Sequence, residues 1–158
     1  MHKIRVLIAP PATAERALPH TEAARGFQGR NGWVVIPLSP ALLEQLAGRK
    51  VPVPDLEDAE AERLFSEYCE AFVPGLLAIV PDLTGVLAAT QYWGGAGAQA
   101  AAALSSGAYV CAPSVSEGAI HRALVSLGCP LLSGLDAFDS VGLGQWRKMD
   151  AFGAGSSR

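Results

Sequence analysis

The sequence predicts an α+β fold, with an antiparallel or mixed sheet of about five strands and two main helices on one face. Strand-like segments follow one another through the second half of the chain, two segments have the apolar spacing of amphipathic helices, and the elements alternate too irregularly for a doubly wound βαβ sheet. With 158 residues the chain can bury a core of its own. We therefore expect one globular domain over residues 1–152 and a disordered tail over 153–158.

Composition and charge exclude several classes of protein. Half of the residues are hydrophobic and the formal net charge is −3, unlike the composition of disordered chains. The 12 basic residues form no dense cluster, so no nucleic-acid-binding face is expected. Three cysteines without a CxxC pair predict reduced thiols and a cytoplasmic location. The apolar runs are too short for a signal-peptide core or a membrane span, so neither is expected.

The first third of the chain predicts two strands and a helix. β-branched runs predict strands over residues 3–9 and 33–36, separated by a long loop with one helical turn near 12–17. Ser39-Pro40 offers an N-cap and a proline at the first helical position, which predicts a helix that ends at Gly48.

A longer amphipathic helix is predicted from Asp55, which is expected to cap it, to Pro74-Gly75, which is expected to end it. The next segment, residues 76–80, is ambiguous between helix and strand. Six carboxylates give this helix an acidic face: Glu57, Asp58, Glu60, Glu62, Glu67 and Glu70. Such a face is usually solvated, but it could also meet a basic partner.

Three strands are predicted in succession after this helix. The first covers residues 86–93. For Ala98–Leu104 the helix propensity of alanine conflicts with a sheet-like context, and we favour a strand because seven residues are few for a helix. Ser105-Ser106-Gly107 is then a hairpin turn into a strand over 108–112.

The last predicted helix follows a capping box made by Ser114 and Glu117, and it ends at Gly128. Asp136 and Asp139 belong to a short helical turn, where capping is a commoner role than metal binding or acid–base chemistry. His121 and Cys129 match no metal spacing, and each has an ordinary packing explanation. We therefore predict no metal site, no cofactor and no catalytic residue.

A glycine turn over Gly94, Gly95 and Gly97 is the most conspicuous motif. Backbone amides in such a turn could hold a phosphate if a helix followed. If a strand follows, no helix dipole points at the turn, and we expect Gly95 and Gly97 to adopt positive φ angles. Next to the turn, Tyr92 and Trp93 point to opposite faces of their strand, so one of them is a candidate for contact with a partner.

Two sequence blocks resemble a group of small uncharacterised bacterial proteins with no known activity. The first is Tyr92-Trp93-Gly94-Gly95-Ala96-Gly97-Ala98-Gln99, and the second is Asp136-Ala137-Phe138-Asp139-Ser140-Val141-Gly142-Leu143-Gly144. The resemblance covers about the second half of the chain and implies a hairpin around the glycine turn and a bacterial source. It implies no catalytic residue.

We expect a noncatalytic protein-binding domain, of the immunity type, that neutralises a basic bacterial toxin. Its contact surfaces would be the acidic helix and the region of the glycine turn, and the candidate binding residues are Tyr92, Trp93, Gly94, Gly95, Gly97, Gln99, Asp136 and Asp139. The alternative is a small enzyme or ligand-binding domain that holds a phosphate or another small anion at Gly94–Gly97. Neither nucleic acid nor a membrane is an expected partner.

Overall fold

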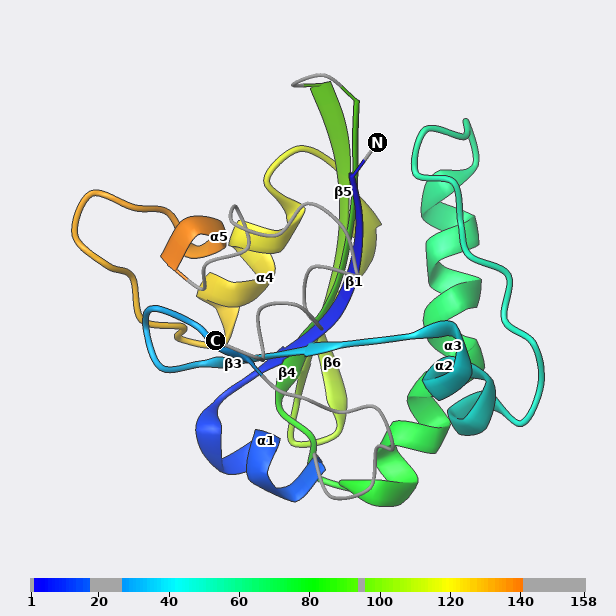
Figure 1. Cartoon of the computed structure of the whole chain (residues 1–158), viewed down its shortest axis with the longest axis horizontal. Coiled ribbons are helices and arrows are strands. Elements are labelled where there is room, and N and C mark those ends of the chain that lie inside the picture. Colours follow the sequence, from blue (N-terminus) through cyan, green and yellow to red (C-terminus); the bar gives the residue numbers. More distant parts are fainter. Residues whose placement is uncertain (1, 18–26, 94–95, 141–158) are drawn as a thin grey trace.

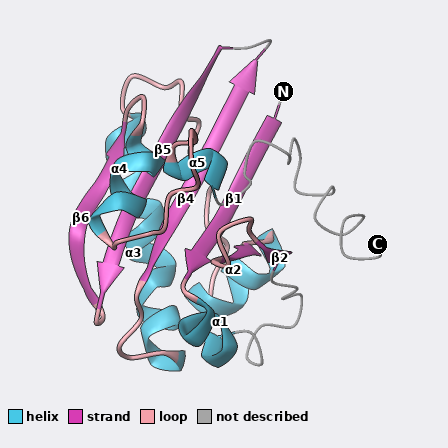
Figure 2. Cartoon of the chain, turned by 90° about the vertical axis from the view of Figure 1, so that its left-hand side faces the viewer, coloured by secondary structure: helices cyan, strands magenta, loops and turns pink. Residues whose placement is uncertain are grey.

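The computed structural model describes residues 2–17, 27–93 and 96–140. Six antiparallel strands form one sheet in the order β2-β3-β1-β4-β5-β6 (Figures 1 and 2). The elements are β1 (His2–Ala9), α1 (Pro11–Ala17), β2 (Phe27–Gln28), β3 (Val34–Pro37), α2 (Pro40–Ala47), α3 (Ala61–Ile79), β4 (Gly85–Trp93), β5 (Ala96–Ser105), β6 (Ala108–Val115), α4 (Ala119–Ser126) and α5 (Ala137–Ser140). The α+β class and the antiparallel sheet are confirmed. The predicted tail at 153–158 lies outside the described residues.

Helices cover both faces of the sheet, whereas the sequence predicted the two main helices on one face. Figure 1 shows α2 and α3 on one side of the strands and α4 and α5 on the other. In β1, Leu7 belongs to the core under α2 and α3, while its neighbours Val6 and Ile8 belong to the core under α4. Because the central strands are apolar on both faces, they need a helical layer on each side.

The alanine-rich segment is a strand, as predicted. β4 and β5 pair antiparallel from Gly85↔Leu104 to Trp93↔Ala96, so these consecutive strands form a hairpin. Successive alanines alternate between the two cores: Ala102 faces α3 and Ala103 faces α4, and both are fully buried. The small side chains explain how an alanine run can serve as a central strand between two helical layers.

α2 begins and ends where the sequence predicts. The Oγ atom of Ser39 accepts a hydrogen bond from the amide of Leu42 at 3.2 Å, and Pro40 occupies the first turn. Gly48 adopts φ 70°, the left-handed conformation that glycine favours at a helix C-terminus. The local sequence is therefore sufficient to define this helix.

α3 differs from its prediction at both ends. It begins at Ala61, because Asp55 and Asp58 bond to the amides of Glu57 and Glu60 in two short turns before it. It also continues through Pro74 to Ile79, so residues 76–79 are helical. The proline is exposed, and water can therefore hydrogen-bond the carbonyl group that its missing N–H leaves free.

α4 also begins differently from its prediction. Ser114 lies in β6 opposite Ala101, so Ser114 and Glu117 do not form a capping box. The helix begins after Gly118, which adopts φ 73°, and it has no side-chain cap from its own N-terminal residue. Its predicted end is confirmed, because Gly128 follows the last turn with φ 73°.

The two outer strands of the sheet are short or irregular. β2 contains two residues, and β6 has register shifts on both sides of the Ala103↔Cys111 pair. Val110 is the extra residue of one β-bulge, and Pro113 lies near the other. Bulges and proline on an edge strand oppose the addition of a further strand.

Candidate functional site

The N-terminal half of α3 and the turns before it carry a concentrated negative charge. Residues 55–70 contain seven of the 15 acidic residues and one basic residue, Arg63. Six exposed carboxylates form what we call the acidic surface: Glu57, Asp58, Glu60, Glu62, Glu67 and Glu70. The acidic face predicted from the sequence is therefore present at the molecular surface.

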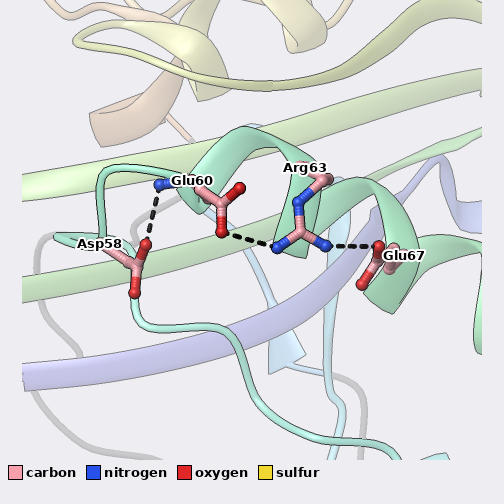
Figure 3. Close-up of polar contacts among 4 residues, drawn as sticks. All are labelled: Asp58, Glu60, Arg63 and Glu67. Carbon is pink, nitrogen blue, oxygen red and sulfur yellow. Dashed lines mark hydrogen bonds and ion pairs between the residues drawn. The ribbon is translucent and has the colours of Figure 1, made fainter.

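The cation within the acidic surface is already paired. Figure 3 shows Arg63 between two carboxylates, with its Nη2 atom 2.8 Å from Oε2 of Glu60 and its Nη1 atom 2.7 Å from Oε1 of Glu67. Asp58 precedes this network and accepts a hydrogen bond from the amide of Glu60 at 2.8 Å. Exposed ion pairs of this kind contribute little to stability. The pairing still leaves several carboxylates in excess over this single guanidinium.

Asp55 lies beside the acidic surface and is fixed to the sheet. Its Oδ1 atom accepts hydrogen bonds from the amide of Glu57 at 3.0 Å and from Nε2 of Gln91 at 2.8 Å. Gln91 is buried in β4, and its Oε1 atom accepts from the amide of Leu56 at 3.3 Å. The bond from Glu57, and then the bond from Gln91, lower the pKa of the Asp55 carboxyl. The carboxylate is therefore ionised at neutral pH and held in one position.

A cavity of about 260 Å³ lies next to Asp55. Arg49 and residues 51–55 form one wall, and α3 forms the other through Leu64, Glu67, Tyr68 and Ala71. The ring of Tyr68 is buried and packs edge-on against Phe72, with 4.8 Å between ring centroids. Burial raises the pKa of this phenol, so it stays protonated at neutral pH.

The residues predicted around the glycine turn lie at one end of the β4–β5 hairpin. Tyr92 pairs with Gly97 and Trp93 pairs with Ala96, while Gly94 and Gly95 lie outside the described residues. Gly97 lies within β5 and is not among the described glycines with positive φ, so that expectation is wrong for Gly97. A strand follows the turn, so no helix N-terminus stands behind it to hold an anion.

The other predicted site residues lie beside α4. The Oε1 atom of Gln99 accepts from the amide of Ile120 at 3.3 Å, which makes Gln99 a cap for this helix. Asp136 is exposed and Asp139 lies within the short helix α5. Ala137, between them, donates its amide to Nδ1 of His121 on α4 at 3.0 Å. Both sequence blocks thus contact the N-terminal half of α4.

The cysteines are free thiols in packed surroundings. Burial raises the pKa of Cys69 to about 12, and it also raises the pKa of Cys129. Nδ2 of Asn31 lies 3.1 Å from Sγ of Cys129 and donates a 2.8 Å bond to the carbonyl of Pro130. A raised pKa disfavours the thiolate that a nucleophilic cysteine requires. Among residues 2–17, 27–93 and 96–140, no group of three or more His, Cys, Asp or Glu side chains could hold a metal ion.

Sequence reasoning missed Gln91 and the cavity. A polar residue inside an otherwise apolar strand pattern is a signal for a buried hydrogen-bonding role, and Gln91 is such a residue. Its partner Asp55 is 36 residues away, so no local pattern connects the two.

Comparison with protein-family models, with curated proteins and with solved structures gives no match for this chain. Among the described helices, none combines the length and apolar character needed to cross a bilayer.

Proposed function

We propose that this chain is a noncatalytic protein-binding domain of the immunity type, and that its acidic surface contacts a basic protein. The acidic surface carries the proposal, because it contains six exposed carboxylates, and Arg63, the one basic residue of segment 55–70, is already paired with two of them. Opposite charges on two proteins accelerate their encounter and select the correct partner. A toxin that acts on nucleic acid is a partner of this kind, since such an enzyme needs a basic surface to neutralise phosphates.

The form of the sheet favours docking on a helix over strand addition. β6 is bulged and contains Pro113, and β2 has two residues, so neither outer strand offers a long regular edge. The acidic surface is exposed to solvent along the turns before α3 and the first half of the helix. A cytoplasmic encounter with the partner, consistent with reduced cysteines, belongs to the same proposal.

Affinity capture with two charge-matched variants tests the proposal. The first variant, Glu57→Gln/Glu62→Gln/Glu70→Gln, removes three carboxylates whose side chains have no hydrogen bond or ion pair among the described residues. The control, Glu15→Gln/Glu44→Gln/Glu117→Gln, removes three exposed carboxylates from other elements. Both variants change the net charge by the same amount, so only the location of the change differs.

We expect the unmodified chain and the control to retain one basic protein from lysate of the producing cells, and the first variant to lose it. Retention should also fall as the salt concentration rises, because the attraction is screened within about 10 Å at 0.1 M salt. Equal retention by both variants, or equal loss from both, would contradict a role for the acidic surface. Turnover of a small molecule by the purified chain, without any protein partner, would contradict noncatalytic binding.

A further inference from the structure

The cavity between residues 49–55 and α3 has the size and chemistry of a site for one side chain. Its volume of about 260 Å³ is below the roughly 300–1,000 Å³ of pockets that hold drug-sized ligands. Val51, Pro54, Leu64 and Ala71 give it apolar walls. An unbranched alkyl chain would fit such walls, whereas a nucleotide or a large cofactor would exceed the space.

The charged groups of the cavity favour a cation. Asp55 and Glu67 contribute two carboxylates and Arg49 contributes one guanidinium, which donates from Nη1 to the carbonyl of Lys50 at 3.3 Å. Further carboxylates of the acidic surface lie on the same turns and the same helix. Glu67 is already paired with Arg63, and Lys3 also acts on the Asp55 carboxyl, so Asp55 is the carboxylate of the cavity that an incoming cation would meet.

The carboxylate of Asp55 is preorganised to bind a cation. Both of its hydrogen bonds reach Oδ1, and no described residue donates to Oδ2. Gln91 and the amide of Glu57 fix the carboxylate before any ligand arrives, so binding does not have to immobilise it. A charged donor bonded to Oδ2 would form a charge-assisted hydrogen bond at the rim of an apolar cavity.

We propose that this cavity receives an arginine or lysine side chain of the basic partner, with the alkyl stem against Val51, Pro54 and Leu64 and the cationic head at Asp55. Long cationic side chains bury their methylene groups along apolar surface while the charge stays near polar groups. The inference rests on the proposed function, because it assigns one anchoring residue of that partner to a defined place beside the acidic surface.

An NMR titration of the ¹⁵N-labelled full chain tests the cavity without the partner. The probe is N-acetyl-L-arginine amide, and its control is N-acetyl-L-citrulline amide, which has nearly the same shape without the charge. We expect the arginine probe to shift amide signals of residues 49–56 and 64–71, and the citrulline probe to shift them at least about fivefold less at equal concentration. N-acetyl-L-lysine amide shows whether the site prefers one cationic head group.

Two matched variants connect binding to Asp55. Asp55→Asn keeps an oxygen that can accept the bonds from Glu57 and Gln91 but removes the charge. Asp58→Asn is the control, because Asp58 is also exposed and accepts a backbone amide but does not line the cavity. We expect Asp55→Asn to raise the dissociation constant of the arginine probe about five- to tenfold, and Asp58→Asn to change it less than twofold.

The cavity proposal is overturned if the citrulline probe binds equally well, if the shifts spread over α3 without a centre at the cavity, or if both variants weaken binding equally. If Asp55→Asn does not fold, the comparison of the two probes on the unmodified chain still decides. Partner capture that depends on the acidic surface, together with no response to the arginine probe, rejects the cavity and keeps the proposed function. A response to the probe at the cavity, together with capture unaffected by Glu57→Gln/Glu62→Gln/Glu70→Gln, keeps the cavity as a cation site and rejects the proposed function.

Discussion

Gln99 of β5 caps α4: its Oε1 atom accepts a hydrogen bond from the amide of Ile120, 21 residues later in the chain, at 3.3 Å. α4 follows Gly118, which has no side chain to accept a first-turn amide. The backbone carbonyl of Gln99 also accepts a hydrogen bond from the amide of Ser116 at 3.1 Å, so Gln99 contacts both the segment before α4 and its first turn. A residue that the sequence placed in a binding motif therefore has a structural role.

Replacement of Gln99 by alanine should destabilise the protein by about 1–2 kcal/mol, the usual cost of losing a helix cap or leaving a partly buried amide unpaired. Gln99→Glu is the matched control, because it keeps an oxygen acceptor and places negative charge at a helix N-terminus. Chemical denaturation should rank the proteins as unmodified, Gln99→Glu and Gln99→Ala in order of decreasing stability. Equal stability of the alanine variant and the unmodified chain would show that the cap contributes nothing.

Gly75 should not tolerate alanine, although it lies inside α3. A Cβ atom at this position would overlap the carbonyl oxygen of Leu46 and lie 2.8 Å from its carbonyl carbon, so α2 would have to move away. In an open helix, alanine would gain about 1 kcal/mol over glycine. Here we expect a net loss of about 1–3 kcal/mol, because the overlap involves rigid backbone. Thermal denaturation of Gly75→Ala should give a lower Tm.

The exposed position Ala78 in the same helix provides the comparison for Gly75. Ala78→Gly measures helix propensity without a clash, and it should cost less than about 1 kcal/mol, because Ala78 lies in the last turn of α3. If Gly75→Ala instead raised the Tm, propensity would outweigh packing, and the close contact between α2 and α3 would have to be more adaptable than its geometry indicates.

Elements with local signals were predictable from the sequence. Ser39 and Gly48 define α2 because the cap, the proline and the left-handed glycine all act within the helix itself. The end of α3 was not predictable in this way, since Pro74, which removes a helical hydrogen bond and crowds the preceding turn, is tolerated on the exposed side of this helix. Which side of α3 faces water depends on packing against the sheet. The placement of helices on both faces of the sheet was not predictable from local signals either. It follows from strands that are apolar on both faces, and each face needs a helical layer to cover it.

The candidate site was predictable in part. The acidic surface follows from composition, since closely spaced carboxylates are rarely buried and therefore face solvent, whether in a turn or in a helix. The link between Asp55 and Gln91 spans 36 residues and exists only after β4 packs beside the turn before α3. Gln99 was predicted as a binding residue, and its capping role could not be inferred, because Ile120 becomes its partner only in the folded structure.

The Asp55 carboxyl should make stability depend on pH in the acidic range. Its hydrogen bonds with Glu57 and Gln91 hold its folded-state pKa below the ordinary value of 3.8. A group with a depressed pKa contributes stability that is fully present above its unfolded pKa and is lost as the pH falls through its folded pKa. The stability advantage of the unmodified chain over Asp55→Asn should therefore be largest above about pH 5 and should shrink toward pH 3.

A ¹³C NMR titration of the Asp55 carboxyl measures the same effect directly. We expect a midpoint below 3.8 in the unmodified chain. Gln91→Leu removes one donor and leaves the amide of Glu57, so the midpoint should rise but stay below the ordinary value. A midpoint at or above 3.8 in the unmodified chain would contradict the fixed, charge-stabilised carboxylate on which the cation site depends.

The buried thiols should react slowly in the folded protein. Burial raises the pKa of Cys69 to about 12 and also raises that of Cys129, so little thiolate exists at pH 7, and the packed surroundings exclude a bulky reagent. Cys111 is only half-buried, so the measurement uses Cys111→Ser to remove its signal. Titration of this variant with a bulky disulfide reagent at pH 7 should be slow in buffer and should become fast, with two thiols labelled, in denaturant. Rapid labelling of one thiol in the folded variant would instead identify an activated cysteine. That result would favour a Cys–His enzyme. His121 would then have to give up the hydrogen bond that its Nδ1 atom accepts from the amide of Ala137 before it could act as a base.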